Sequence, residues 1–450
     1  MQFQLTDELV EQVEKLIETY DDVALEGLLQ DVHFADIAEL LQELTIDEAT
    51  YIIKLLEAEI TSEALMEMDD DFREGILENL SPQEIAVELN EMDTDDAADF
   101  IAELDEDIQR QVIDEIEDEE HAADIIELLK YEEDTAGALM AKELVRVKET
   151  WTIAGCVTEM RRQAENVTRV HSIYVTDKKG VLKGRLSLKD LLTAPEGAHI
   201  SDIYIPKVDY VNVHTENEEV ARIMQKYDLE AIPVVDDKGI LVGRITIDDI
   251  VDFIKEEAEK DYQMAAGISQ DVEADDSILQ LTRARLPWLI LALIGGFVSV
   301  SVLGTFSEAM NKHASLFFFV PLIAAMAGNV GVQSSAIVLQ ALANDSLKGS
   351  MIKRLIKEVL LSLLNGFILS VLLILGGMFI MGLDFKFGLT IAISLVSVIV
   401  TASLIGTFVP IFLDKRGIDP AMATGPFITT SNDIFGILIY FSIAKIILGF

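Results

Sequence analysis

Apolar residues are spread very unevenly along this chain. After Arg285 they gather into nearly continuous apolar stretches, at about 287–306, 316–343, 355–382, 387–413 and 425–448. Each stretch is as long as the ~20 residues that a helix needs to cross ~30 Å of hydrocarbon. A series of such runs argues against core helices of a soluble protein. Residues 285–450 are therefore predicted to form a five-helix transmembrane domain.

The first part of the chain, residues 1–134, has a helical pattern of a different kind. Leu, Ile and Ala recur three to four positions apart, and Pro82 is the only proline there. The pattern also repeats, because residues 36–45 realign with 84–93 and residues 97–101 realign with 122–126. Short helical repeats predict an all-α repeat domain, a small solenoid in which each repeat packs on its neighbours.

Between these parts, residues 136–258 contain two β-rich units of similar sequence, 172–191 and 231–250. Each unit reads as a strand, a turn (Asp-Lys-Lys-Gly or Asp-Asp-Lys-Gly), a second strand and the start of a helix. A hydroxyl and a carboxylate stand at each helix start, namely Ser187 with Asp190 and Thr246 with Asp249. These groups can cap the helix, and they also suit contact with a ribose. Both interpretations remain open at this point.

Charge is divided as unevenly as hydrophobicity. Residues 1–134 hold 45 Asp and Glu against 5 Lys and Arg, in a chain whose net charge is −45. Binding to nucleic acid requires clustered Lys and Arg, so nucleic acid is excluded as a partner. Cations are the natural counter-charge. The single cysteine, Cys156, excludes an intrachain disulfide, and the polar, acidic start of the chain predicts no cleaved signal peptide.

Basic residues near the apolar stretches predict the orientation in the membrane. One set of links carries eight of them, namely Arg283, Arg285, Lys348, Lys353, Arg354, Lys357, Lys415 and Arg416. The opposite links carry only Lys312 and Lys386, with Lys445 near the last residue. Positive charge favours the cytoplasmic side. We therefore expect a cell (inner) membrane protein with a cytoplasmic N-terminus and an external C-terminus.

The second apolar stretch contains polar and helix-loosening residues. Pro321, Gly328 and Gly331 are expected to loosen the helix. Asn329 and Gln333 are four positions apart and so share one face. Small and polar residues also join membrane helices to one another, so helix packing is the alternative interpretation.

The fifth stretch contains Asp433, the clearest acidic residue within a predicted span. A carboxylate at such a depth is costly and marks an ion path, a proton relay or a paired charge. Thr429 and Thr430 share its face, and no basic residue is evident at a comparable depth. Oxygen ligands without His or Cys suit a hard cation such as Mg²⁺. A two-fold homodimer would bring two such carboxylates together.

The duplicated β-rich unit resembles the CBS domain pair, a common sensor of adenine nucleotides. The whole chain, in order, resembles the MgtE family of magnesium channels and transporters. The resemblance rests on Gly328-Asn-Val-Gly-Val-Gln, and on Asp419-Pro420 followed by Gly425-Pro426-Phe427 and Asp433. It implies an acidic N domain (1–134), CBS domains (135–198 and 199–258), a connecting helix with linker (259–284) and the pore domain (285–450).

The resemblance also implies roles for particular residues. Asp433 matches the pore aspartate that binds hydrated Mg²⁺ on a dimer axis, with Gly328, Asn329, Gln333 and Thr429 beside it. Regulatory Mg²⁺ ions are implied at acidic positions of all three cytoplasmic parts, namely Asp93, Asp95, Glu216, Asp228, Asp249, Asp252, Glu256, Glu257 and Glu259. Many members carry a second Asn where this chain has Val332, a departure that bears on ion selectivity.

These observations together predict a homodimeric, Mg²⁺-selective channel or channel-like transporter that cytoplasmic Mg²⁺ closes. It is not expected to be an enzyme, because the sequence shows no nucleophile–base pair, P-loop or zinc-ligand spacing. ATP is a candidate regulatory ligand at Ser187, Asp190, Thr246 and Asp249. Two alternatives remain, a transporter of Mn²⁺ or Co²⁺ and a membrane-anchored nucleotide sensor without transport.

Overall fold

The protein is described here by a computed structural model. It describes residues 5–449 except 165–169, 171, 196, 271, 273–275, 344–346, 348–349 and 424. Lys348, one of the basic residues used above for orientation, lies outside the described residues. The chain divides into two compact units, Met1–Ile254 and Lys255–Phe450, which are described separately.

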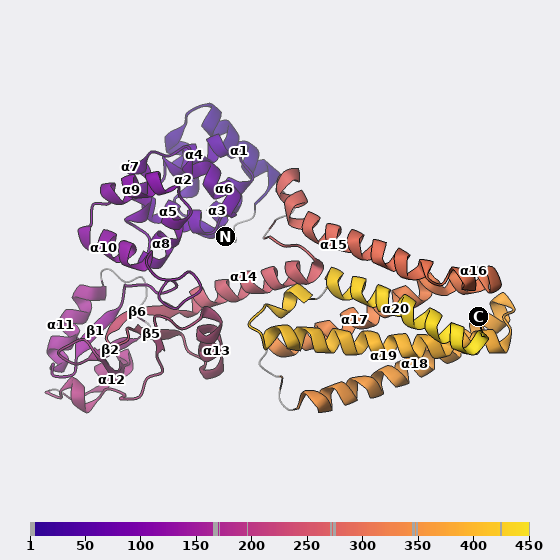
Figure 1. Ribbon diagram of the computed structural model, residues 1–450. Helices are drawn as coiled ribbons and strands as arrows, with labels where there is room; N and C mark the ends of the chain where they lie inside the picture. The colour runs from indigo at the N-terminus through magenta and orange to yellow at the C-terminus, as the bar shows by residue number, and fades with distance from the viewer. Residues whose placement is uncertain are drawn as a thin grey trace. The chain divides into compact units, whose positions relative to one another are not determined.

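The first unit opens with ten short helices in succession (Figure 1). They are α1 (Asp7–Glu18), α2 (Asp22–Leu29), α3 (Phe34–Gln42), α4 (Ile46–Ile53), α5 (Ala58–Met66), α6 (Asp70–Leu77), α7 (Pro82–Leu89), α8 (Thr94–Ala102), α9 (Glu106–Glu115) and α10 (Glu119–Leu128). Capping boxes define some of their starts, as at Thr45 with Glu48 and at Ser81 with Glu84. Alternate helices pack together, α3 on α5, α5 on α7 and α7 on α9. The repeats in the sequence predict this stacking.

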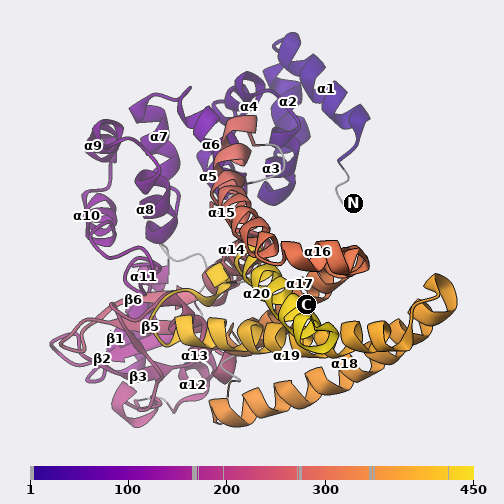
Figure 2. The same cartoon turned by 45° about the vertical axis from the view of Figure 1, so that its right-hand side comes forward.

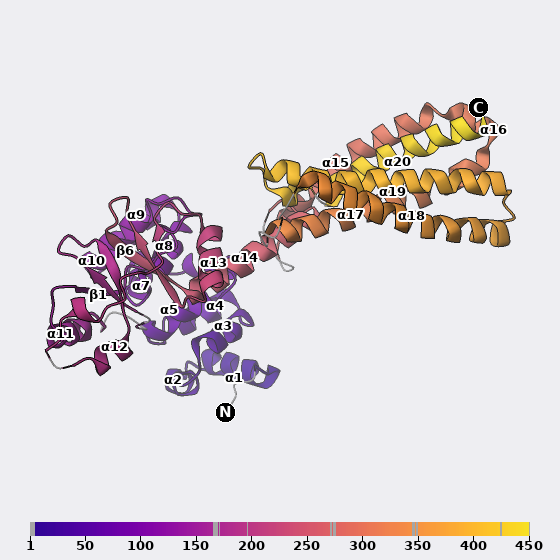
Figure 3. The ribbon, with the colours of Figure 1, turned by 90° about the horizontal axis from the view of Figure 1, so that it is seen from below.

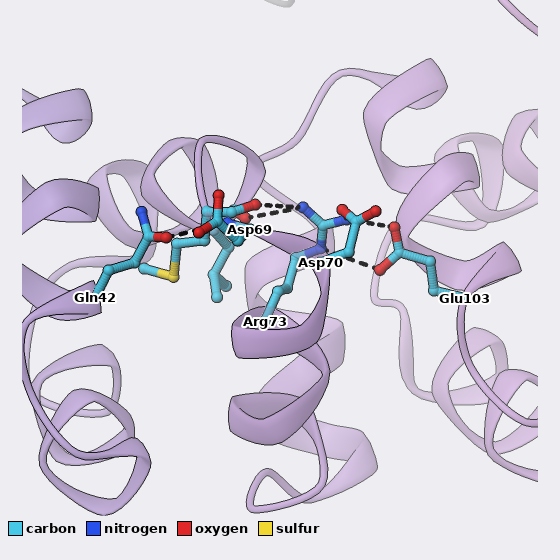
Figure 4. A network of polar contacts seen from close by, with 7 residues as sticks. Gln42, Asp69, Asp70, Arg73 and Glu103 are labelled. Carbon is cyan, nitrogen blue, oxygen red and sulfur yellow. Dashed lines mark hydrogen bonds and ion pairs between the residues drawn. The ribbon is translucent and has the colours of Figure 1, made fainter. Parts of the chain in front are cut away.

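A buried guanidinium joins successive repeats of this helical domain (Figure 4). Arg73 of α6 is only 5% exposed. Its Nε donates to Glu103 Oε2 at 3.0 Å, its Nη2 donates to Asp70 Oδ1 at 2.7 Å, and its Nη1 donates to the carbonyl of Met68 at 3.2 Å. Glu103 follows the last residue of α8, so Arg73 ties α6 to α8. Every donor direction of the fork meets an acceptor, which a buried charge requires.

The remainder of the first unit contains two three-stranded sheets of the same design (Figure 2). Strands β1 (Val145–Lys148), β2 (Ile173–Thr176) and β3 (Leu182–Leu186) form one, and β4 (Val211–Asn212), β5 (Ala231–Val235) and β6 (Leu241–Thr246) form the other. In each sheet the first pair is parallel and the second antiparallel, with a register shift in the middle strand. The sequence duplication is therefore a structural duplication.

Helices complete each α/β half. They are α11 (Ile153–Gln163), α12 (Leu188–Thr193) and α13 (Asn217–Tyr227). The turns between the paired strands place Gly180 and Gly239 at φ +85° and +76°. Only glycine enters this region at little cost, which explains the glycine of both predicted turns.

Helix α14 (Ile247–Ala266) follows β6 directly and runs across residue 258, where the sequence places the end of the second CBS domain. No helix breaker interrupts it before Gly267, which has φ +83°. The helix therefore contributes residues to both units, since the boundary between them follows Ile254.

Among its described residues, the second unit contains five helices long and apolar enough to span a membrane, as the sequence predicts (Figure 3). They are α15 (Ile278–Gly304), α17 (Val320–Ala343), α18 (Met351–Met381), α19 (Phe385–Asp414) and α20 (Gly425–Leu448), with the short α16 (Ser307–Lys312) after the first. Helix α19 is the most buried and packs on α17, α18 and α20, whereas α15 packs on α20. Small side chains on the buried face of α19 allow this close packing.

The expected loosening of the second span is wrong. Helix α17 is continuous from Val320 to Ala343. Pro321 lies in its first turn, where a missing N–H costs nothing. Gly331 serves close packing instead, because a methyl group there would lie 1.9 Å from Asn432 Nδ2.

Candidate cation sites

The first candidate site is a cluster of carboxylates between the helical domain and the segment that follows it. Asp93 precedes α8, Asp95 lies in its first turn, and Glu143 lies just before β1. Oxygen atoms of these three side chains lie within 4.8 Å of one another. Asp95 is 8% exposed, and its buried Oδ1 has no hydrogen-bond partner. This arrangement offers a cation three carboxylates from two separate segments.

Thr94 holds Glu143 in the cluster. Its hydroxyl donates to Glu143 Oε2 at 2.9 Å, and its backbone N–H points to the same oxygen at 3.3 Å. The hydroxyl in turn accepts from the backbone N–H of Lys142 at 2.9 Å. The loop before β1 is thereby fastened to the start of α8, and the Glu143 carboxylate is kept beside Asp93 and Asp95.

Several carboxyl groups in and around this cluster have raised pKa values. Burial, followed by Glu143, raises the pKa of Asp93 to about 6. Burial, followed by Asp249 of α14, raises the pKa of Asp96 to about 8. Burial also raises the pKa of Asp95 and of Asp249. Buried carboxylates that are held close together have such shifts. A divalent cation would remove the repulsion, and oxygen ligands alone suit Mg²⁺ or Ca²⁺.

The structure brings together three of the sequence-predicted regulatory residues, Asp93, Asp95 and Asp249, whose charges act on one another. Sequence reasoning missed Glu143 and Asp96. Asp96 was within reach, since it stands beside Asp95 in an acidic run. Glu143 lies in a linker with no repeat or motif, so only the fold shows it.

The other predicted regulatory residues lie on the surface and stay predictions. Glu216 and Asp228 flank the two ends of α13. Asp252, Glu256 and Glu259 are exposed on α14, and Glu257 is partly buried with its Oε2 3.7 Å from Lys260 Nζ. Among the residues that the structure describes, the cluster of Asp93, Asp95 and Glu143 is the one group of three or more with ligand atoms in reach of a single ion.

The second candidate site surrounds Asp433 in the membrane unit. Asp433 is partly buried on α20 and lines a hollow of about 460 Å³. Thr429 and Thr430 of the same helix line it, as do Ser299 of α15 and Ala324 of α17. Within the described part of the chain, neither a hydrogen bond nor an ion pair joins the Asp433 carboxylate. A carboxylate beside hydroxyls in an apolar span offers the oxygen ligands that a cation site requires.

The sequence-predicted site residues of α17 differ in burial. Gly328 is buried, and a methyl group on it would lie 3.3 Å from Thr429 Cγ2. Asn329 and Gln333 are exposed, so they face outward from this chain. Among the described residues, neither of them lines the hollow beside Asp433.

Two polar residues of the membrane unit were not predicted from the sequence. Asn432 is 1% exposed, donates from Nδ2 to the carbonyl of Ala327 at 3.3 Å, and has a buried Oδ1 with no hydrogen-bond partner. Glu358 of α18 accepts from the Ser334 hydroxyl at 2.6 Å. Both lie within predicted spans, so their polarity alone was a signal.

The end of α14 meets the start of α20. A methyl group on Gly425 would lie 2.6 Å from the carbonyl oxygen of Ala265, and one on Gly267 would lie 2.6 Å from Pro426 Cγ. Asp433 follows Gly425 by eight residues on the same helix, about 12 Å along its axis. The end of α14 and the helix that carries Asp433 are therefore in close contact at this point.

The candidate nucleotide residues are engaged with one another. Ser187 donates to Asp190 Oδ2 at 2.6 Å and accepts from the Asp190 N–H at 3.0 Å. Thr246 donates to Asp249 Oδ2 from both its hydroxyl and its N–H, each at 2.8 Å. These contacts are local caps, and a role in nucleotide binding stays a prediction.

Known protein families match successive parts of the chain. Residues 320–443 match the MgtE divalent cation transporter family, residues 32–134 match the MgtE intracellular N domain, and residues 136–197 and 200–256 match the CBS domain. The magnesium transporter MgtE of Thermus thermophilus is 37% identical over 72% of this chain and 73% of its own length. That of Bacillus subtilis is 36% identical over 70% of both chains.

Solved structures resemble the first unit. The cytosolic domain of a Mg²⁺ channel MgtE, crystallised in complex with ATP, is 34% identical, with a TM-score of 0.52. It corresponds to 54% of this chain and 99% of its own. The soluble part of a magnesium transporter is 28% identical with a TM-score of 0.51 over 56% of this chain and 99% of its own.

Proposed function

Since the chain belongs to the MgtE family of magnesium transporters, we propose that it is a Mg²⁺-selective channel or channel-like transporter whose ion path passes Asp433. The observation that carries the proposal is the position of Asp433 in the hollow between α15, α17 and α20, where the described lining residues include no basic side chain. Thr429 and Thr430 add hydroxyl oxygens to the same hollow. Mg²⁺ keeps much of its water shell, so a carboxylate with hydroxyls around it suits contact with the hydrated ion.

The proposal includes a homodimer. A single carboxylate is a weak site for a divalent ion. A two-fold axis beside α20 would bring a second Asp433 carboxylate to the same site. The outward-facing Asn329 and Gln333 of α17 favour such an assembly, because exposed amides within a membrane span need a partner or water. Closed two-fold dimers are also the commonest symmetric assembly.

The first experiment is Mg²⁺ flux into liposomes that hold the purified chain. Asp433→Asn should reduce the flux to background while the protein remains folded. Glu308→Gln is the matched control, because Glu308 is an acidic residue of the same unit that lies outside the spans and pairs with Lys312. Normal flux in Asp433→Asn would remove Asp433 from the path. Flux of Mn²⁺ or Co²⁺ without flux of Mg²⁺ would indicate a transporter of another divalent ion. An absence of flux for every ion tested would favour a membrane-anchored nucleotide sensor.

We further propose that Mg²⁺ on the side of the acidic domains closes the path. The support is helix α14, which supplies Asp249 to the acidic cluster and Ala265 to the contact with Gly425 at the start of α20. A cation that draws the carboxylates together would hold α14, and so α20, in one state.

Varying Mg²⁺ separately on the two sides of the liposome tests the gate. Flux should fall as Mg²⁺ rises on the side of the acidic domains. Asp95→Asn should require more Mg²⁺ for the same closure, and removal of residues 1–134 should leave conduction but weaken closure. Unchanged Mg²⁺ inhibition in both variants would refute the gate and leave the transport proposal intact.

ATP is proposed as a regulatory ligand of the CBS pair. The support is the relative that was crystallised with ATP. ATP should raise the melting temperature of the full chain, and Asp190→Ala should reduce that shift. An absence of any ATP-induced shift in the wild-type chain would exclude the site.

A further inference from the structure

Arg244 lies buried beside the acidic cluster and is held there by its backbone. It is 5% exposed on β6. Its N–H donates to the carbonyl of Ala141 at 2.9 Å, and its carbonyl accepts from the Ala141 N–H at 2.8 Å. Ala141 precedes Glu143 by two residues. The strand that carries Arg244 is therefore fixed against the segment that supplies a carboxylate to the cluster.

The guanidinium acts on carboxylates from two different segments. Its Nη2 lies 3.7 Å from Asp93 Oδ2 at the start of α8. It lowers the pKa of Asp93 and also that of Asp249 in α14, against the effect of burial on both. The nearby Lys142 is directed elsewhere, with its Nζ 2.8 Å from Glu127 Oε1. Arg244 is thus the positive charge that acts at the centre of this cluster.

A bound divalent ion and this guanidinium would be held by the same negative charges. Arginine stays protonated at every accessible pH, so its charge is permanent. A permanent cation stabilises the ion-free cluster and repels an incoming cation. Both effects weaken ion binding, and their size grows as the surroundings become less polar.

We propose that Arg244 is a built-in counter-charge that lowers the affinity of the Asp93–Asp95–Glu143 cluster for Mg²⁺ and so sets the concentration at which Mg²⁺ binds. This inference deepens the gate proposed above and rests on the cluster being its Mg²⁺ site. A counter-charge and a purely structural ion pair differ in the effect that removing the arginine has on Mg²⁺ binding. Loss of a structural pair would weaken Mg²⁺ binding or leave it unchanged, whereas loss of a counter-charge strengthens it.

The test measures Mg²⁺ binding directly, by the Mg²⁺ concentration that gives half of the maximal thermal protection of the full chain in detergent. Arg244→Gln should lower this midpoint at least about tenfold, because one positive charge near a divalent site is removed. Arg244→Lys keeps the charge and should stay within about threefold of the wild type. Arg73→Gln is the matched control, a second buried arginine of the same unit whose acceptors, Glu103 and Asp70, lie outside the cluster. It should lower stability without a change in the midpoint.

Arg244→Gln should be purified in saturating Mg²⁺ and then titrated down with chelator, so that a variant that needs the ion to fold still gives a midpoint. A midpoint equal to or above that of the wild type would overturn the proposal, and so would a variant that fails to fold even in saturating Mg²⁺. The flux assay separates the two proposals. A lowered binding midpoint without any Mg²⁺ inhibition of flux would support the counter-charge and refute the gate.

Discussion

At the scale of single residues, burial distinguishes a few carboxylates from the many on the acidic surface. Glu88 of α7 is 6% exposed, and the Thr61 hydroxyl donates to its Oε2 at 2.6 Å. Burial raises its pKa to about 7, in spite of this hydrogen bond. The folded chain therefore holds a proton on Glu88 between about pH 4.5 and pH 7 that the unfolded chain has lost. The free energy of unfolding consequently falls as pH rises through this interval.

Glu88→Gln should remove this fall in the free energy of unfolding, because glutamine does not ionise. The variant should match the wild type near pH 5 and be the more stable protein at pH 8, by up to about 3 kcal/mol for a shift of this size. Melting temperatures of the full chain in chelator at both pH values measure the difference. Glu78→Gln, at an exposed position after α6, should have no effect at either pH. A Glu88→Gln variant that is not stabilised at pH 8 would contradict the argument.

Single residues also show what sequence reasoning can propose. Asp433 was proposed because a carboxylate in an apolar span is visible without a structure, and Asp93 was proposed from the family resemblance. Glu143 was not found, because contacts of the folded chain, among them the hydrogen bond from Thr94, bring it to α8 across the intervening 48 residues. The polarity of Asn432 within a predicted span was visible in the sequence, but its packing against Gly331 and Ala327 of another helix was not.

At the scale of helices, the membrane unit depends on glycines that let α17 and α19 cross closely. A methyl group on Gly406 of α19 would lie 2.3 Å from the carbonyl oxygen of Gly331 in α17. That oxygen belongs to a helix backbone, so it cannot move aside as a flexible side chain would. The expected loosening of α17 was wrong for this reason. A glycine in a membrane span can serve helix flexibility or close helix packing. The sequence of one helix alone does not distinguish these two roles.

Gly406→Ala should therefore separate α17 from α19, lower the melting temperature of the membrane unit and reduce Mg²⁺ flux. Overpacking of this kind costs about 1–3 kcal/mol. Gly376→Ala is the matched control on α18, because nothing lies within 4 Å of a methyl group there. The control should be neutral or slightly stabilising, since alanine favours helix. Equal behaviour of the two variants would show that the crossing is looser than the structure describes.

At the scale of the whole chain, the patterns that extend over many residues were predicted well. The five spans, the helical repeats and the duplicated α/β unit each rest on periodicity or duplication over tens of residues, so no single contact decides them. The acidic charge lies in the first unit, and the links between the spans carry the basic residues. This asymmetry determines which compartment the acidic cluster faces, and hence which pool of Mg²⁺ the proposed gate would sense.

Cysteine labelling in intact cells tests that orientation. Cys156 is the only native cysteine and is buried, so labelling of a single added cysteine can be measured without replacing Cys156. Ser307→Cys lies between the first two spans and should react with a membrane-impermeant maleimide from outside. Asp414→Cys, at the end of α19, should react only after lysis, because the neighbouring Lys415 and Arg416 favour the cytoplasmic side. The reverse pattern would place the acidic cluster outside the cell, where it could not respond to cytoplasmic Mg²⁺, and the proposed gate would then have to sense the external ion.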